Sequence, residues 1–134
     1  MIGIVIVAHG GLAREYLAAV EHVVGAQTGI RAITIESDHD RSAKQAEIIR
    51  AADEVDDGTG VVVVTDMFGS SPSNLSLPAC AGRNRRILYG ANLPMLVKLA
   101  KSRRLPVADA AKAAMEAGRK YINSMEIGGG DQDS

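Results

Sequence analysis

Two residues with side chains suited to catalysis stand directly after the most apolar stretches of the chain. His9 follows the apolar run of residues 1–8, and Asp66 follows the valine-rich run of residues 60–65. A carboxylate beside an imidazole accepts a hydrogen bond from one ring nitrogen, fixes the tautomer and leaves the other nitrogen as an exposed nucleophile. If the fold brings His9 and Asp66 together, the pair is suited to a covalent intermediate on histidine.

The segment after Asp66 contains groups that would hold a phosphate. Phe68-Gly-Ser-Ser-Pro72 supplies flexible backbone, several N–H groups, two hydroxyls and the expected beginning of a helix. Gly10, directly behind His9, lets the backbone approach a ligand closely. The candidate catalytic residues are therefore His9 and Asp66, and the candidate phosphate-binding residues are Gly10, Gly69, Ser70 and Ser71. This set favours a phosphohistidine intermediate over hydrolysis.

Other polar residues are interpreted as surface or structural groups. His22 lies within a predicted helix, and His39 lies in the acidic segment 36–40, which we expect to cap the next helix. Their spacing is not typical of a metal site. Cys80, among apolar residues, is expected to be packed. A basic group, expected to be a solvated surface or a docking face for an acidic protein, consists of Arg83, Arg85, Arg86, Lys98, Lys101, Arg103 and Arg104.

The elements that must position these residues alternate between strand and helix. Runs rich in β-branched residues predict strands over residues 1–8, 30–35, 60–65 and 86–89. Helical spacing of apolar residues predicts helices over residues 12–24, 42–55, 71–81, 95–101 and 107–122. We expect the third helix to have Ser71 as its N-cap and Pro72 at its first position, and Pro78 to shorten or kink it.

This alternation predicts an α/β fold in a single domain. The expected architecture is a doubly wound, mainly parallel four-stranded sheet in the order 2-1-3-4, with helices on both faces. In that order the first and third strands are neighbours where the strand order reverses, and ligands bind beyond the carboxyl ends of strands at such a point. We therefore expect His9 and Asp66 to meet there.

Composition limits the class of protein. The chain has 134 residues, 15 lysines and arginines against 16 acidic residues, a formal net charge of −1, one cysteine and no tryptophan. This near-neutral charge, with 3% aromatic residues, argues against nucleic acid as a partner. Because we find neither a signal peptide nor an apolar run long enough for membrane insertion, we expect a cytoplasmic protein. The glycine-rich residues 128–134 are expected to form a disordered tail.

Three ordered motifs resemble the enzyme IIA component of the mannose family of the bacterial phosphoenolpyruvate:sugar phosphotransferase system. They are Ile4-Val-Ile-Val-Ala-His-Gly10, Val64-Thr-Asp-Met-Phe-Gly-Ser-Ser-Pro-Ser-Asn74 and Gly90-Ala-Asn-Leu-Pro-Met-Leu-Val97. The resemblance implies that residues 1–127 form a IIA domain that acts as a phosphotransferase in sugar transport, with no cofactor or metal. His9 would accept a phosphoryl group from the histidine-containing phosphocarrier protein and pass it to a IIB component, while Asp66 orients the ring.

The chain departs from the usual family pattern at two positions. Members commonly have serine or threonine where this chain has Ala8, and a second glycine where it has Ser70. We expect Ser70 to be tolerated either because its φ stays negative or because the turn adapts. The resemblance also implies a homodimer in which a C-terminal strand crosses to pair antiparallel with the partner's sheet. The segment 121–127 is the candidate for that strand.

Two alternatives to sugar transport stay open. One is a regulatory phosphoprotein of the same system, in which the phosphorylation state of His9 controls a target protein. The other is a small hydrolase that uses His9 and Asp66, although the sequence has no G-x-S-x-G nucleophile motif.

Overall fold

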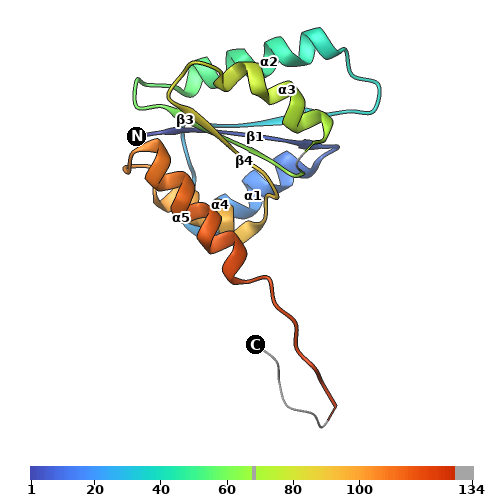
Figure 1. Ribbon diagram of the computed structural model, residues 1–134, viewed down its shortest axis with the longest axis vertical. Coiled ribbons are helices and arrows are strands. Elements are labelled where there is room, and N and C mark those ends of the chain that lie inside the picture. The colour runs from blue at the N-terminus through green and yellow to red at the C-terminus, as the bar shows by residue number, and fades with distance from the viewer. Residues whose placement is uncertain (68, 129–134) are drawn as a thin grey trace.

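A four-stranded parallel sheet lies between two layers of helices (Figure 1). This computed structural model describes residues 1–67 and 69–128. The strands β1 (Gly3–His9), β2 (Ile30–Ile35), β3 (Val61–Thr65) and β4 (Arg85–Leu88) are hydrogen-bonded in the order β2-β1-β3-β4. The helices are α1 (Leu12–Val24), α2 (Arg41–Val55), α3 (Ser71–Cys80), α4 (Leu93–Lys101) and α5 (Val107–Lys120). The predicted fold class and strand order are confirmed.

The two faces of the sheet bury alternate residues of each strand. Ile4, Ile6 and Ala8 of β1 pack with residues of α1, α4 and α5, whereas Val5 and Val7 pack with residues of α2 and α3. Both faces are therefore dry, which explains why the strands read as apolar runs without alternation. His9 continues the series of Val5 and Val7, so it belongs to the face that α2 and α3 cover (Figure 1).

Element boundaries differ from the predicted ones by one or two residues. His9 is the last residue of β1 and does not follow the strand. The N-cap of α3 is Ser70, so the prediction of Ser71 as the cap is wrong, and Pro78 lies inside a helix that continues to Cys80. Helix α4 already begins at Leu93, because the Asn92 side chain caps it by accepting a hydrogen bond from the Met95 N–H.

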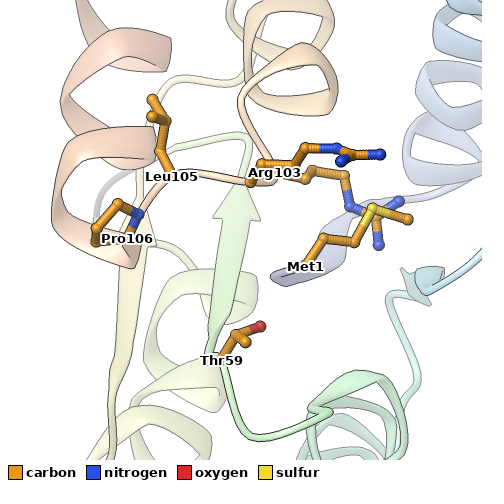
Figure 2. A pocket seen from close by; sticks show the side chains of 6 residues that line it. Met1, Thr59, Arg103, Leu105 and Pro106 are labelled. Carbon is orange, nitrogen blue, oxygen red and sulfur yellow. The ribbon is translucent and has the colours of Figure 1, made fainter.

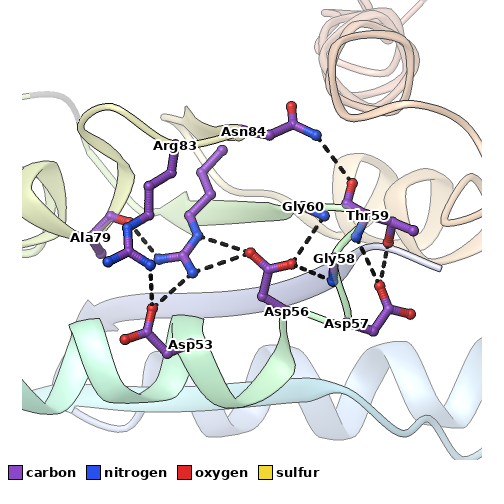
Figure 3. Close-up of polar contacts among 10 residues, drawn as sticks. Asp53, Asp56, Asp57, Gly58, Thr59, Gly60, Ala79, Arg83 and Asn84 are labelled. Carbon is purple, nitrogen blue, oxygen red and sulfur yellow. Dashed lines mark hydrogen bonds and ion pairs between the residues drawn. The ribbon is translucent and has the colours of Figure 1, made fainter.

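Arg85 holds the amino end of the sheet together by binding Asp53, Asp56 and Ala79, three residues that Figure 3 labels. Its guanidinium donates to the carbonyl of Ala79 at 2.7 Å and lies 2.8 Å from Asp53 and 3.2 Å from Asp56. Burial alone would raise the pKa of Asp56, but backbone N–H donors at Gly58 and Gly60 and the Arg85 charge lower it overall. With its side chain only 1% exposed, Arg85 is a structural residue.

Arg103 is the second buried arginine at the same end of the sheet. Its guanidinium donates to the carbonyls of Ile2 at 2.8 Å and Thr28 at 2.7 Å. Arg103 also lines a pocket of about 500 Å³. Figure 2 shows its side chain with those of Met1 and Pro106, which line the same pocket. The prediction of a solvated basic surface is therefore wrong for Arg85 and Arg103, since both side chains bind backbone carbonyls inside the fold.

The chain after α5 leaves the body of the domain (Figure 1). Residues 122–127 form neither helix nor strand in this single chain, and their apolar side chains are exposed, Ile127 to 87%. Of the predicted disordered tail, residues 129–134 lie outside the described residues.

Candidate functional site

His9 and Asp66 meet at the carboxyl end of the sheet. Strands β1 and β3 pair in parallel with Val7 opposite Thr65, so both chains leave the sheet side by side. The ring nitrogen Nδ1 of His9 lies 2.8 Å from Oδ2 of Asp66, and the backbone N–H of His9 donates to the same oxygen at 3.0 Å. One carboxylate oxygen therefore fixes both the backbone and the ring of the histidine.

The electrostatics of the pair define the tautomer of His9. A carboxylate oxygen only accepts, so Nδ1 carries the proton and Nε2 of the neutral ring keeps its lone pair. Burial alone would raise the pKa of Asp66, but the backbone hydrogen bond, the ring hydrogen bond and the charge of His9 lower it overall. The His9 side chain is 50% exposed and that of Asp66 only 9%. The arrangement thus presents a nucleophilic nitrogen to solvent and keeps its ionised partner inside.

The second carboxylate oxygen of Asp66 is buried. Oδ1 has no hydrogen-bond partner among the described residues. A buried carboxylate oxygen without a described donor leaves part of the negative charge of Asp66 without a hydrogen-bond partner. Asp66 can therefore stabilise the cationic ring that forms when His9 Nε2 takes a substituent.

The glycine-serine turn before α3 lies beside this pair. Gly69 has φ +76° and Gly10 has φ +54°, a left-handed conformation that strains residues with a Cβ. Of the two ways in which Ser70 could be tolerated, the structure shows the negative φ, at −86°. Its hydroxyl donates to the carbonyl of Met67 at 2.7 Å and so tethers the turn. The Ser71 side chain makes no hydrogen bond to another described residue.

A cleft of about 430 Å³ opens at His9. Its lining consists of His9, Gly10, Ile35, Glu36, Ser37, His39 and Ser71. Of the predicted phosphate-binding residues, the structure brings Gly10 and Ser71 into this cleft. The loop after β2 is there because Ile35 pairs with His9 across the strands, and the Gly10 N–H donates to the Ile35 carbonyl. The predicted role of this loop as a helix cap is confirmed for Asp40. Sequence reasoning missed its place at the cleft, which the predicted pairing of the first two strands could have indicated.

Comparison with known proteins now identifies the family. The sequence profile of the family described as PTS system fructose IIA component matches residues 3–116. The chain belongs to this family. Its IIA proteins carry phosphoryl groups in the sugar phosphotransferase system.

Solved structures of IIA proteins have the same fold. EIIA from Streptococcus agalactiae is 26% identical, with 92% of this chain and 97% of that chain covered and a TM-score of 0.82. The IIA protein associated with the fucose utilization operon of Streptococcus pneumoniae is 26% identical, with 90% and 91% covered and a TM-score of 0.78. The mannose/sorbose-specific IIA subunit of Enterococcus faecalis shares 22% identity, 95% and 96% coverage and a TM-score of 0.84, which shows a common fold. Comparison with curated proteins gives no significant match.

The third motif of this IIA protein lies behind Asp66. The Ala91 N–H donates to the carbonyl of Thr65 at 3.1 Å, and the Tyr16 hydroxyl donates to the carbonyl of Ala91 at 3.0 Å. Burial, followed by the charge of Asp66, raises the pKa of the Tyr16 phenol. Tyr16 is therefore a neutral support of the loop behind the site. No local pattern marks this role, because Tyr16 and Ala91 are far apart in the sequence.

The remaining candidates lie away from the cleft or are structural. His22 is exposed on α1, on the opposite face of the sheet. Burial raises the pKa of the Cys80 thiol to about 11. Within residues 1–67 and 69–128, no three histidine, cysteine or acidic side chains group as a metal ion would need. No helix in that part of the chain is long and apolar enough to span a membrane.

Proposed function

We propose that this chain is a phosphocarrier that acts in the cytoplasm and forms a phosphohistidine at Nε2 of His9. The observation that carries the proposal is the 2.8 Å contact of Nδ1 with Asp66, which directs Nε2 outward in its nucleophilic form. The donor is the phosphorylated histidine-containing phosphocarrier protein, and the acceptor is a IIB component. Residues 1–127 constitute the functional domain.

The transfer step exchanges one P–N bond for another. The Nε2 lone pair of His9 attacks the donor's phosphorus, and the donor's P–N bond breaks with its electron pair returning to the donor imidazole. The His9 ring becomes positive, and Nδ1–H stays hydrogen-bonded to Asp66, whose charge stabilises it. Attack by a IIB nucleophile on the phosphorus reverses these changes.

The start of α3 and the turn before it receive the phosphoryl oxygens. Ser71 lines the cleft at the first position of α3, where backbone N–H groups have no partner within the helix. At Gly10 and Gly69, which have positive φ and no side chain, the backbone can come close to the phosphoryl group. The Ser70 hydroxyl fixes the turn by donating to the Met67 carbonyl.

The proposal is tested by labelling with radioactive phosphoenolpyruvate, enzyme I and the histidine-containing phosphocarrier protein. Wild type and His22→Ala should acquire an acid-labile, base-stable label, as expected of a phosphoramidate, and His9→Ala should acquire none. Equal labelling of His9→Ala, or an acid-stable label on serine, refutes the proposal. Chasing with a IIB component should discharge the protein; a labelled protein that never discharges favours the regulatory alternative.

We also propose that the chain forms a homodimer through residues 121–127. β4 is an edge strand, and a groove of about 490 Å³ along it is lined by Ile87, Leu88, Met95 and Met115 among others. The extended segment carries exposed Ile122 and Ile127, and an open strand edge accepts a further strand. Pairing of this segment with the partner's β4 would cover both.

Light scattering tests the dimer. Wild type should have twice the mass of one chain, and a variant with Ile122→Asp and Ile127→Asp should be monomeric with an unchanged circular dichroism spectrum. The matched control is Leu77→Asp, which adds charge to an exposed apolar residue on α3, outside residues 121–127 and the groove along β4. A monomeric wild type, or a dimeric double variant, contradicts the proposal.

A further inference from the structure

The loop between β2 and α2 brings a second histidine to the cleft at His9. The Nδ1 atom of His39 lies 2.7 Å from the carbonyl oxygen of Glu36, and the His39 N–H contacts the same oxygen at 3.3 Å. The ring is therefore fixed on the turn that leads out of β2. Because Ile35 pairs with His9, this turn follows the residue next to His9 in the sheet.

The contact with Glu36 defines what His39 presents to the cleft. A carbonyl oxygen only accepts, so Nδ1 of His39 must carry a proton. In the neutral ring, Nε2 then has a lone pair, which repels phosphoryl oxygens. In the imidazolium, Nε2 has an N–H that donates to them. A phosphoryl group in the cleft would therefore favour the protonated ring.

The described residues that line the cleft carry no permanent positive charge to balance a phosphoryl group. None of the described residues that line it is a lysine or an arginine. Glu36 lines it with a carboxylate, and Asp66 stands on the other side of His9. Asp38 and Asp40 belong to the loop of His39, and Arg41 begins α2 outside the lining. Besides His9, His39 is thus the described residue of the cleft whose side chain becomes a cation with two N–H donors when it is protonated.

We propose that His39 binds the phosphoryl group of His9 as an imidazolium, so that phosphorylation of His9 is coupled to protonation of His39. The inference rests on the proposed function and adds a phosphoryl-binding residue to it. The bonds formed and broken in the phosphoryl transfer are those described under Proposed function. The additional proton comes from solvent and binds to Nε2 of His39. By reciprocity, acid favours the phosphorylated protein and phosphorylation favours the imidazolium.

The first measurement is a nitrogen-detected NMR titration of His39 in wild type before and after phosphorylation. An anion within about 4–6 Å raises the midpoint of a histidine titration by roughly one pH unit or more. The titration of His22, exposed on the opposite layer, should not move. An unchanged His39 midpoint overturns the inference without requiring any variant to fold.

The second measurement is the equilibrium of phosphoryl exchange with the phosphocarrier protein at acidic and alkaline pH. His39→Asn keeps a donor for the Glu36 carbonyl but removes the group at Nε2, and His22→Asn is the matched control. A shift of one pH unit in the His39 titration corresponds to about a tenfold change in the equilibrium constant of phosphoryl exchange. Near pH 6 this constant should therefore be about tenfold larger for wild type than for His39→Asn. Near pH 9 the two constants should be almost equal. Equal pH dependence in the two proteins contradicts the inference.

The two proposals fail in different ways. If wild type accepts no phosphoryl group on His9, the proposed function is wrong and the role of His39 falls with it. If wild type and His39→Asn are both labelled on His9, with identical pH dependence, the proposed function stands and only the role of His39 is refuted.

Discussion

Replacement of Asp66 by asparagine isolates the charge that orients His9. In wild type, Oδ2 of Asp66 accepts from Nδ1 of the ring at 2.8 Å and from the backbone N–H at 3.0 Å. An asparagine oxygen can accept both bonds but has no charge to stabilise a cationic ring. Its NH₂ group would stand where Oδ1 is buried without a described partner. The substitution therefore preserves shape and removes charge.

The expected loss follows from the strength of the bond to Nδ1. A hydrogen bond to a charged group contributes about 1.5–3 kcal/mol, of which most is lost with the charge. Since each 1.4 kcal/mol is about tenfold in rate, phosphoryl transfer should slow by roughly 10–150-fold. The buried amide, without an acceptor, should also lower the free energy of unfolding by about 1–3 kcal/mol.

The assay is rapid-quench transfer from the labelled phosphocarrier protein. Asp40→Asn is the matched control: Asp40 is exposed and caps α2 through the Ala43 N–H, and asparagine caps equally well. Both variants lose one negative charge at the same end of the sheet, so a general effect on protein docking appears in both. A rate of phosphoryl transfer to Asp66→Asn within about threefold of the rate to Asp40→Asn corresponds to less than about 1 kcal/mol in activation free energy. That result would mean that Asp66 does not stabilise the reacting ring.

The same variant predicts a pH dependence of stability. The pKa of Asp66 is lowered in the folded protein, so its carboxylate stabilises the fold above the ordinary aspartate pKa of about 3.9, and this contribution is lost as the pH falls through the folded value. The difference in unfolding free energy between wild type and Asp66→Asn should therefore be constant near neutral pH and shrink in acid. A difference that grows in acid has the wrong sign for this mechanism.

Three further substitutions or reactions test the scaffold. Arg85→Met should lower the free energy of unfolding in urea by about 3 kcal/mol, because it removes a buried guanidinium from the buried Ala79 carbonyl and the half-buried Asp56. Arg83→Met, on an exposed side chain, should cost less than about 1 kcal/mol, and equal costs would contradict the structural role of Arg85. Gly10→Ala should cost about 1–2 kcal/mol in thermal unfolding because of its φ of +54°. Gly11→Ala, at φ −81° and at the N-cap of α1, should cost less than about 1 kcal/mol, and a larger cost at Gly11 than at Gly10 would contradict the reasoning. Cys80, with its pKa raised to about 11 by burial, should react with iodoacetamide near neutral pH at least about tenfold more slowly than in the unfolded chain, and equal rates would mean that it is accessible.

Sequence patterns determined the elements and the pairing of strands in this protein. Apolar runs such as 60–65 and helical spacing such as that over 12–24 are local signals, because burial on one or two faces imposes a period on the chain. Parallel connections are right-handed, so the order of elements also predicted that the strands before His9 and Asp66 would be neighbours. The contact between His9 and Asp66 was therefore predictable from the sequence.

Local patterns predicted helix ends and buried charges less well than they predicted the elements themselves. Leu93 and Pro94 read as a loop because proline interrupts helices, but proline is tolerated in the first turn, where its missing N–H would have no partner, and Asn92 supplies the cap. Arg85 and Arg103 read as surface residues because charge is usually solvated, yet carbonyls and carboxylates from distant segments enclose them. Partners that lie far away in the sequence leave no local signal.

Only the tertiary structure decided which atoms meet at the site. The choice of Nδ1 of His9 as the partner of Asp66 follows from the exact direction in which β1 and β3 end, a geometry that residue types do not contain. His39 reaches the cleft because β2 pairs with β1 in a register that sets Ile35 opposite His9. A shift of register by one residue would turn the side chains of β2 to the other face, so its loop belongs to this site through strand pairing and not through any motif.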